Sequence, residues 1–151
     1  MAAARNVCLL LFIVLLTTSV RSQEAAVTDS IRKSLAKATN PADRVYLLDE
    51  LSRVLMNVNM GEAEEAGKQL IAEAEESRDR KLMFQAYISN GIRCSYFSGQ
   101  KVYAGRAIEY FEKAQELARQ IRMEKEVGSA QMFLSAIYLT VPNKEKALSY
   151  A

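Results

Sequence analysis

Small residues recur along this chain at intervals close to 40 residues, and this recurrence limits the possible folds more than any other feature. The members of one series are separated by 39 and 44 residues and those of a second by 44 and 40: Ser52, Gly91 and Ser135, and Ala63, Ala107 and Ala147. A period near 40 with two helices per unit is typical of helical solenoids. Small residues are needed where neighbouring helices cross closely. We therefore expect an all-α fold, an α-solenoid of antiparallel helical hairpins.

Two types of helix alternate between these markers. The first type, A, is predicted from about residue 41 to the break near 57–61, and again over 81–97 and 124–140, each copy with a small residue near its middle. The second type, B, is predicted over 62–78 and 103–122, with a third copy starting at Ala147. Apolar or small residues mark one face of each B helix at steps of four, three and four residues: Ala63, Gly67, Leu70 and Ala74, then Ala107, Phe111, Ala114 and Ala118.

Helix boundaries are marked by few but strong signals. Pro occurs only at Pro41 and Pro142, so the long stretches between them are free to be helical. Asn40 is suited to accept from the free backbone amides of a helix that starts at Pro41. A shorter helix with one apolar stripe is predicted to start at Asp29 and Ser30, and we interpret residues 23–39 as an N-terminal capping helix.

The first 22 residues have the three parts of a secretory signal peptide. Arg5 supplies the positive start, an apolar run follows over residues 7–16, and a short polar stretch ends at Ser22. The run is too short for a bilayer core, which takes about 20 apolar residues. We therefore predict cleavage after Ser22 and a secreted or periplasmic protein, with an uncleaved anchor as the alternative.

Composition argues against several classes of function. Removing the predicted leader leaves 18 basic and 18 acidic residues, so charge gives no reason to expect nucleic acid as a partner. The chain has no His, which removes the commonest general base and the usual imidazole metal ligand. Its two Cys are Cys8, in the leader, and Cys94, which we interpret as a small buried hydrophobe. We predict no catalytic residue, no cofactor, no metal site and no small-molecule substrate.

Two stretches that resemble ligand-binding motifs have simpler interpretations. The segment from Gly61 to Lys68 has five residues between its glycines where a phosphate-binding loop has four, and Gln69 replaces the Ser or Thr that binds magnesium. The glutamates of residues 62–76 alternate with basic residues on the predicted solvated face of a helix, where such pairs support helicity.

The repeated unit resembles the tetratricopeptide repeat family. The closest stretch is residues 130–147, AQMFLSAIYLTVPNKEKA, and residues 86–118 resemble the same unit with a longer loop. Residues 43–77 are the weakest copy, because Gly67 and Leu70 stand where the family prefers a large aromatic residue and Ala. The resemblance implies a TPR-like superhelix over 40–151, with about two and a half repeats: units of about 41–80 and 81–123, and a third at 124–151 that is truncated in its B helix.

Members of this family bind partners in a concave groove lined by the A helices. Carried over from Ser52, Gly91 and Ser135, the groove positions are mixed and mostly apolar: Asp49, Arg53, Ile88, Ser89, Ile92, Ser95, Met132, Phe133 and Ala136. They lack the Lys and Asn with which some repeats clamp a terminal carboxylate, so the resemblance implies an apolar or helical partner.

Three functions remain open on the sequence. The first is a non-catalytic module that binds a protein or peptide in its groove. The second is the sensor region of a larger membrane signalling protein of the histidine-kinase or transcription-regulator type, because a leader followed by such repeats resembles the extracytoplasmic part of those proteins; contact with a membrane would then require a longer chain. The third is a helical-bundle enzyme or carrier. Self-association through an uncapped C-terminal face is a further expectation.

Overall fold

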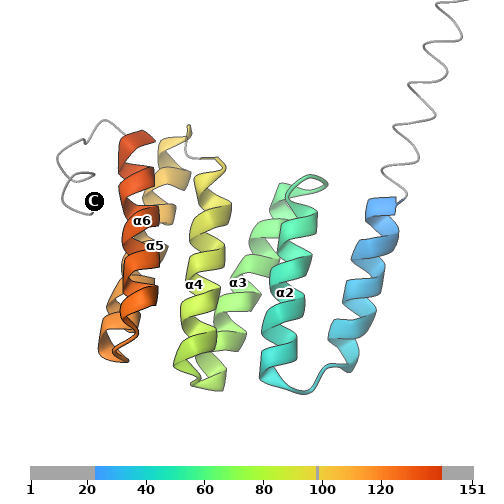
Figure 1. Cartoon of the computed structure of the whole chain (residues 1–151). Coiled ribbons are helices and arrows are strands. Elements are labelled where there is room, and N and C mark those ends of the chain that lie inside the picture. Colours follow the sequence, from blue (N-terminus) through green and yellow to red (C-terminus); the bar gives the residue numbers. More distant parts are fainter. Residues whose placement is uncertain (1–22, 98, 141–151) are drawn as a thin grey trace, which may run out of the picture.

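The computed structural model describes residues 23–97 and 99–140, and every regular element within these ranges is an α-helix (Figure 1). A helix over residues 23–37 is followed by α2 (Pro41–Leu55), α3 (Met60–Ser77), α4 (Arg80–Ser95), α5 (Lys101–Gln120) and α6 (Glu124–Thr140). The all-α prediction is confirmed, and the predicted helices differ from the observed ones by about two residues at their ends. The leader and the third B helix at Ala147 lie outside the described residues.

Short polar side chains define where the helices begin. Asn40 accepts a hydrogen bond from the backbone N–H of Ala42 at 2.8 Å, as the sequence predicts. Asn59 caps α3 in the same way, and Asp79 accepts from the first turn of α4 at 2.8 and 3.3 Å. These caps satisfy donors that have no partner within the helix. They fix the residues at which α2, α3 and α4 begin.

The N-terminal helix differs from the prediction in its start. It is already helical at residue 23, so Asp29 and Ser30 lie inside the helix and do not cap it. Its apolar stripe packs against the first hairpin through Ile31 and Leu35. The stretch before Asp29 continues the helix because 23–28, Gln-Glu-Ala-Ala-Val-Thr, contains neither Pro nor Gly.

Consecutive helices pack against each other from α2 to α6, and the A helices also contact one another. Figure 1 shows α2, α4 and α6 in one layer and α3 and α5 behind them. The backbones of α2 and α4 are in contact, as are those of α4 and α6, whereas α3 and α5 share no backbone contact among the described helices. The molecule is therefore a row of antiparallel helices in two layers, with the A helices closer together than the B helices.

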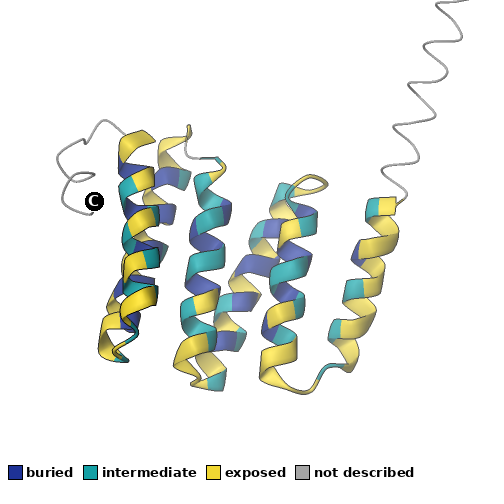
Figure 2. Cartoon of the chain, viewed as in Figure 1, coloured by how far each residue is buried: buried dark blue, intermediate teal, exposed yellow. Residues whose placement is uncertain are grey.

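The core lies between the layers, and the two B-helix faces predicted from the sequence are buried (Figure 2). Gly91 shows why a small residue is needed in the middle of α4, because a Cβ at this position would lie 2.4 Å from the ring of Phe111. Within residues 23–97 and 99–140, none of the helices is long and apolar enough to cross a membrane.

Candidate functional site

The A-helix layer carries two hollows, one on each side of α4. The first, between α2 and α4 with one α3 residue at its floor, has a volume of about 310 Å³. It is lined by Ala42, Val45, Tyr46, Asp49, Leu70, Gln85, Ala86 and Ser89. The second, where α4 and α5 meet α6, has a volume of about 170 Å³ and is lined by Ser95, Phe111, Phe133, Ala136, Ile137 and Thr140. The first hollow is mixed in polarity and the second is mostly apolar.

Five of the nine groove residues expected from the sequence line these hollows. Asp49 and Ser89 line the first hollow, and Ser95, Phe133 and Ala136 line the second. Of these, Ala136 is exposed, so its side chain forms part of the surface and not of the core.

The other four residues have different surroundings. Ile88 and Ile92 are half-buried and pack against the core around Phe111. Arg53 is exposed and forms an ion pair with Glu50 on the preceding turn of its own helix. Met132 is 60% exposed on α6 and lines neither hollow. The structure therefore brings part of the predicted set together and leaves Arg53 and Met132 outside.

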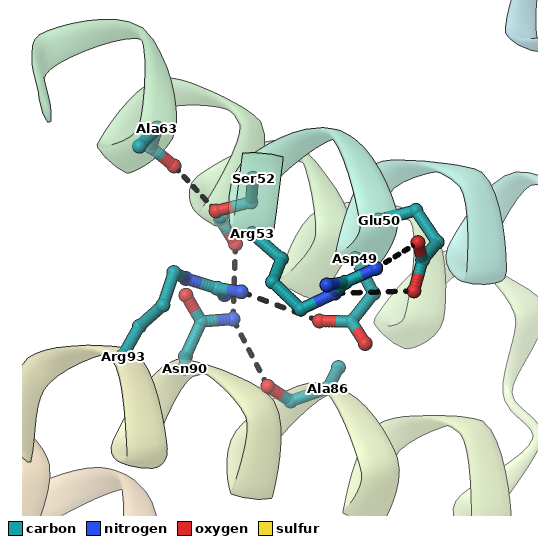
Figure 3. A network of polar contacts seen from close by, with 9 residues as sticks. Asp49, Glu50, Ser52, Arg53, Ala63, Ala86, Asn90 and Arg93 are labelled. Carbon is teal, nitrogen blue, oxygen red and sulfur yellow. Dashed lines mark hydrogen bonds and ion pairs between the residues drawn. The ribbon is translucent and has the colours of Figure 1, made fainter. Parts of the chain in front are cut away.

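Beneath the first hollow, a buried polar network joins α2, α3 and α4 (Figure 3). Ser52 Oγ donates to the carbonyl of Ala63 at 2.7 Å. Asn90 Nδ2 donates to the carbonyls of Gly67 at 3.1 Å and Ala86 at 2.9 Å. Arg93 Nη1 donates to Asp49 Oδ1 at 3.2 Å. These bonds tie three helices together at one point, and they hold Asp49 at the edge of the first hollow.

Arg93 is unusual because it is an arginine inside the protein, only 7% exposed. Burial lowers the pKa of its guanidinium, and the nearby Asp49 carboxylate opposes this shift. Room for the side chain comes from Gly67, where a Cβ would lie 2.5 Å from Asn90 Oδ1 and 3.1 Å from Arg93 Nη2. Gly67 on α3 thus leaves space that the side chains of Asn90 and Arg93 occupy.

The equivalent positions of the next hairpin carry apolar side chains. Moving 44 residues along the chain leads from Gly67 to Phe111, from Asn90 to Leu134 and from Arg93 to Ile137. All three are buried in one cluster, and the ring of Phe111 stacks on that of Phe133 with centroids 5.0 Å apart. We call Gly67, Asn90 and Arg93 with Asp49 the polar junction, and Phe111, Leu134 and Ile137 the apolar junction.

Sequence reasoning did not single out Asn90 and Arg93. Their signal was present in the 44-residue spacing, which places Asn90 and Arg93 where the next hairpin has two aliphatic residues, and Gly67 where it has Phe111. Because a helix presents residues three apart on one face, Asn90 and Arg93 both point toward Gly67. A match of the two units position by position would have found them.

The remaining chemistry of the described residues is limited. Burial raises the pKa of the half-buried Cys94 thiol, which makes it a poorer nucleophile. No group of three or more acidic or Cys side chains that could hold a metal ion occurs in the part of the chain that the structure describes.

Comparison with known proteins adds no family to this description. No protein-family model matches the chain, and no curated protein matches its sequence.

Proposed function

We propose that this protein is a TPR-like helical solenoid that binds a protein or peptide segment along its A-helix layer. The observation that carries the proposal is the pair of hollows on either side of α4, whose linings include Asp49, Ser89 and Ala136. Direct contact between successive A helices, without backbone contact between α3 and α5, is the arrangement that would curve the row toward the A side.

The chemistry of the two hollows suggests what such a segment would offer. Tyr46 is 65% exposed beside the first hollow, where Asp49 and Gln85 supply polar groups. An exposed aromatic next to polar groups is a common feature of binding surfaces. The second hollow is mostly apolar. A partner with polar groups near α2 and an apolar side chain near α6 would satisfy both.

The test begins with peptides selected from a displayed library on the full chain, whose affinities are measured by fluorescence anisotropy. Ala136→Glu puts a charge in the second hollow without removing core packing, because Ala136 is exposed. Ala72→Glu is the matched control, since Ala72 is an exposed alanine on α3. We expect Ala136→Glu to weaken binding about tenfold or more, equivalent to about 1.4 kcal/mol. Equal affinities of the two variants would reject the A-helix layer as the binding surface.

Phe133 and Ile92 are less suitable sites for this test. Phe133 stacks on Phe111, and Ile92 packs against the same core, so a charge at either position would destabilise the fold as well as the surface.

We further propose that the chain is exported, as its first 22 residues suggest. N-terminal sequencing of protein recovered from a secreting host tests this point, with Gln23 as the expected first residue.

A further inference from the structure

A cleft of about 190 Å³ lies between α3 and α5, over α4, and the A-helix hollows do not include it. Because the backbones of α3 and α5 do not touch, side chains bridge the gap on one side of the cleft. Glu64 accepts a hydrogen bond from Tyr103 Oη at 2.5 Å and forms an ion pair with Arg106 at 3.5 Å. These contacts give the cleft a defined wall.

The charged side chains that line the cleft are mostly cationic. Its lining includes three cationic side chains, Lys68, Arg93 and Arg106, and one carboxylate, Glu64. Glu64 is already bound by Tyr103 and Arg106, so its charge is balanced within the wall. Arg93 and Lys68 have acidic partners outside the lining, Asp49 at 3.2 Å and Glu65 at 3.7 Å. The Lys68–Glu65 pair is exposed and therefore contributes little, so Lys68 can exchange Glu65 for the carboxylate of a ligand.

One of these cations has an unused donor. Arg93 Nη1 is bound to Asp49, whereas Arg93 Nη2 is buried and has no hydrogen-bond partner among the described residues. A buried donor without a partner is costly, and a carboxylate is the group that a guanidinium binds best. Because Nη2 is closed off from solvent, a ligand has to shift the guanidinium slightly in order to reach it.

The volume of the cleft and its apolar lining limit which ligands can bind. Apolar atoms come from Met60, Ala63 and Tyr110, beside the half-buried Cys94. The volume is below the roughly 300 Å³ that drug-sized ligands need. Inorganic phosphate has no apolar part that could pack against these walls, whereas an organic carboxylate has one.

We infer that this cleft binds a small organic monocarboxylate with an apolar or aromatic body, held at its carboxylate by Arg93 and Lys68. The site is distinct from the proposed partner surface, because it lies behind α4, between the B helices. The two proposals can therefore be tested, and rejected, independently of each other.

The test uses benzoate as the probe and the full ¹⁵N-labelled chain. Titration followed by NMR should shift the Arg93 Nε–Hε resonance and the amide of Gly67, with a dissociation constant of about 1 mM or below, as expected for so small a ligand. Benzamide, which has the same shape without the charge, and inorganic phosphate should each bind at least tenfold more weakly. Benzamide or phosphate binding as tightly as benzoate would overturn the assignment. So would the absence of any shift at a benzoate concentration about 20 times the expected dissociation constant.

Substitutions locate the site. Arg93→Met should weaken benzoate binding at least tenfold and Lys68→Gln about threefold, whereas Lys125→Gln, an exposed lysine on α6, should leave it unchanged. Equal losses in Lys68→Gln and Lys125→Gln would contradict the site. If Arg93→Met does not fold, the comparison of benzoate with benzamide on the unmodified chain still decides the question.

Discussion

The polar junction and the apolar junction fill equivalent spaces, between α3 and α4 and between α5 and α6, with different kinds of side chain. At the apolar junction, the ring of Phe111 fills the space against Gly91 and stacks on Phe133. At the polar junction, Gly67 provides no side chain, and Asn90 and Arg93 reach across to the backbone and to Asp49 instead. The first solution depends on shape and the second on directional hydrogen bonds.

This difference has consequences for both stability and function. A close-packed apolar contact tolerates little change in volume. A buried hydrogen-bonded network is costly if one partner is removed, but it leaves polar atoms and space that a ligand can use. Both the cleft between α3 and α5 and the placement of Asp49 in the first hollow depend on the polar junction.

The largest effect is expected from Phe111→Ala at the apolar junction. Removing this ring leaves a cavity, so the free energy of unfolding should fall by about 3 to 5 kcal/mol in urea denaturation. Phe97→Ala is the control, because Phe97 is only half-buried and lies in the turn after α4. A loss no larger than that of the control would show that the apolar junction does not depend on the ring.

A smaller loss is expected from Gly91→Ala. The added methyl group would lie 2.4 Å from Phe111, and relieving this overlap should lower the free energy of unfolding by up to about 3 kcal/mol. Gly128→Ala, in α6, meets no atom within 4 Å and should raise it by about 0.5 to 1 kcal/mol. Thermal or urea unfolding of the two variants measures both changes in the free energy of unfolding. Equal stability of the two variants would rule out the close approach of Gly91 to Phe111.

At the polar junction, Asp49→Asn should reduce the free energy of unfolding by about 1 to 2 kcal/mol. The change leaves the buried Arg93 without its charged partner, although the side chain of Asp49 is 35% exposed, which limits the loss. Glu50→Gln, which breaks the neighbouring surface pair with Arg53, should cost about 0.5 kcal/mol or less. The ion pair would be dispensable if both variants unfolded at the same urea concentration.

The smallest effect concerns pH and Tyr87, which donates to Glu75 across the α3–α4 contact at 2.7 Å. Burial and this hydrogen bond raise the pKa of Tyr87 to about 12 from its usual 10. A raised pKa means that the stabilisation is fully present below pH 10 and is lost between pH 10 and 12. At pH 11 the loss should be about 1 kcal/mol, since one pKa unit corresponds to about 1.4 kcal/mol.

Tyr87→Phe provides the control for this prediction. The variant should lack this part of the decline in stability above pH 10, while the other tyrosines contribute equally to both proteins. Parallel curves of unfolding free energy against pH for the two proteins would contradict the prediction.

The helices were predictable because their signals are local. Caps such as Asn40 and the spacing of small residues on α3 and α5 act over one or two turns, and both appear where the sequence places them. The start of the N-terminal helix was predicted wrongly because Asp and Ser are common at helix N-caps. Here Asp29 and Ser30 lie inside the helix, which packs against the first hairpin through other residues.

The candidate site was only partly predictable, because it depends on which side chains meet across helices. Asp49 lines the first hollow, but its bond to Arg93 joins residues 44 positions apart. Counted from Ser52 and Ser135, Met132 corresponds to Asp49 and Arg53 corresponds to Ala136. Met132 and Arg53 nevertheless line neither hollow, and Arg53 pairs with Glu50 instead. The cleft requires the missing side chain of Gly67 and the reach of Arg93 together.

The triple variant Gly67→Phe, Asn90→Leu and Arg93→Ile tests most directly the claim that the two junctions are equivalent solutions. It transfers the apolar junction to the first hairpin, and its free energy of unfolding in urea is compared with those of the three single variants. We predict that Gly67→Phe alone loses about 2 kcal/mol or more through overlap, whereas the triple variant is at least as stable as the original chain. A triple variant that loses the sum of the three single losses would contradict the equivalence of the two junctions.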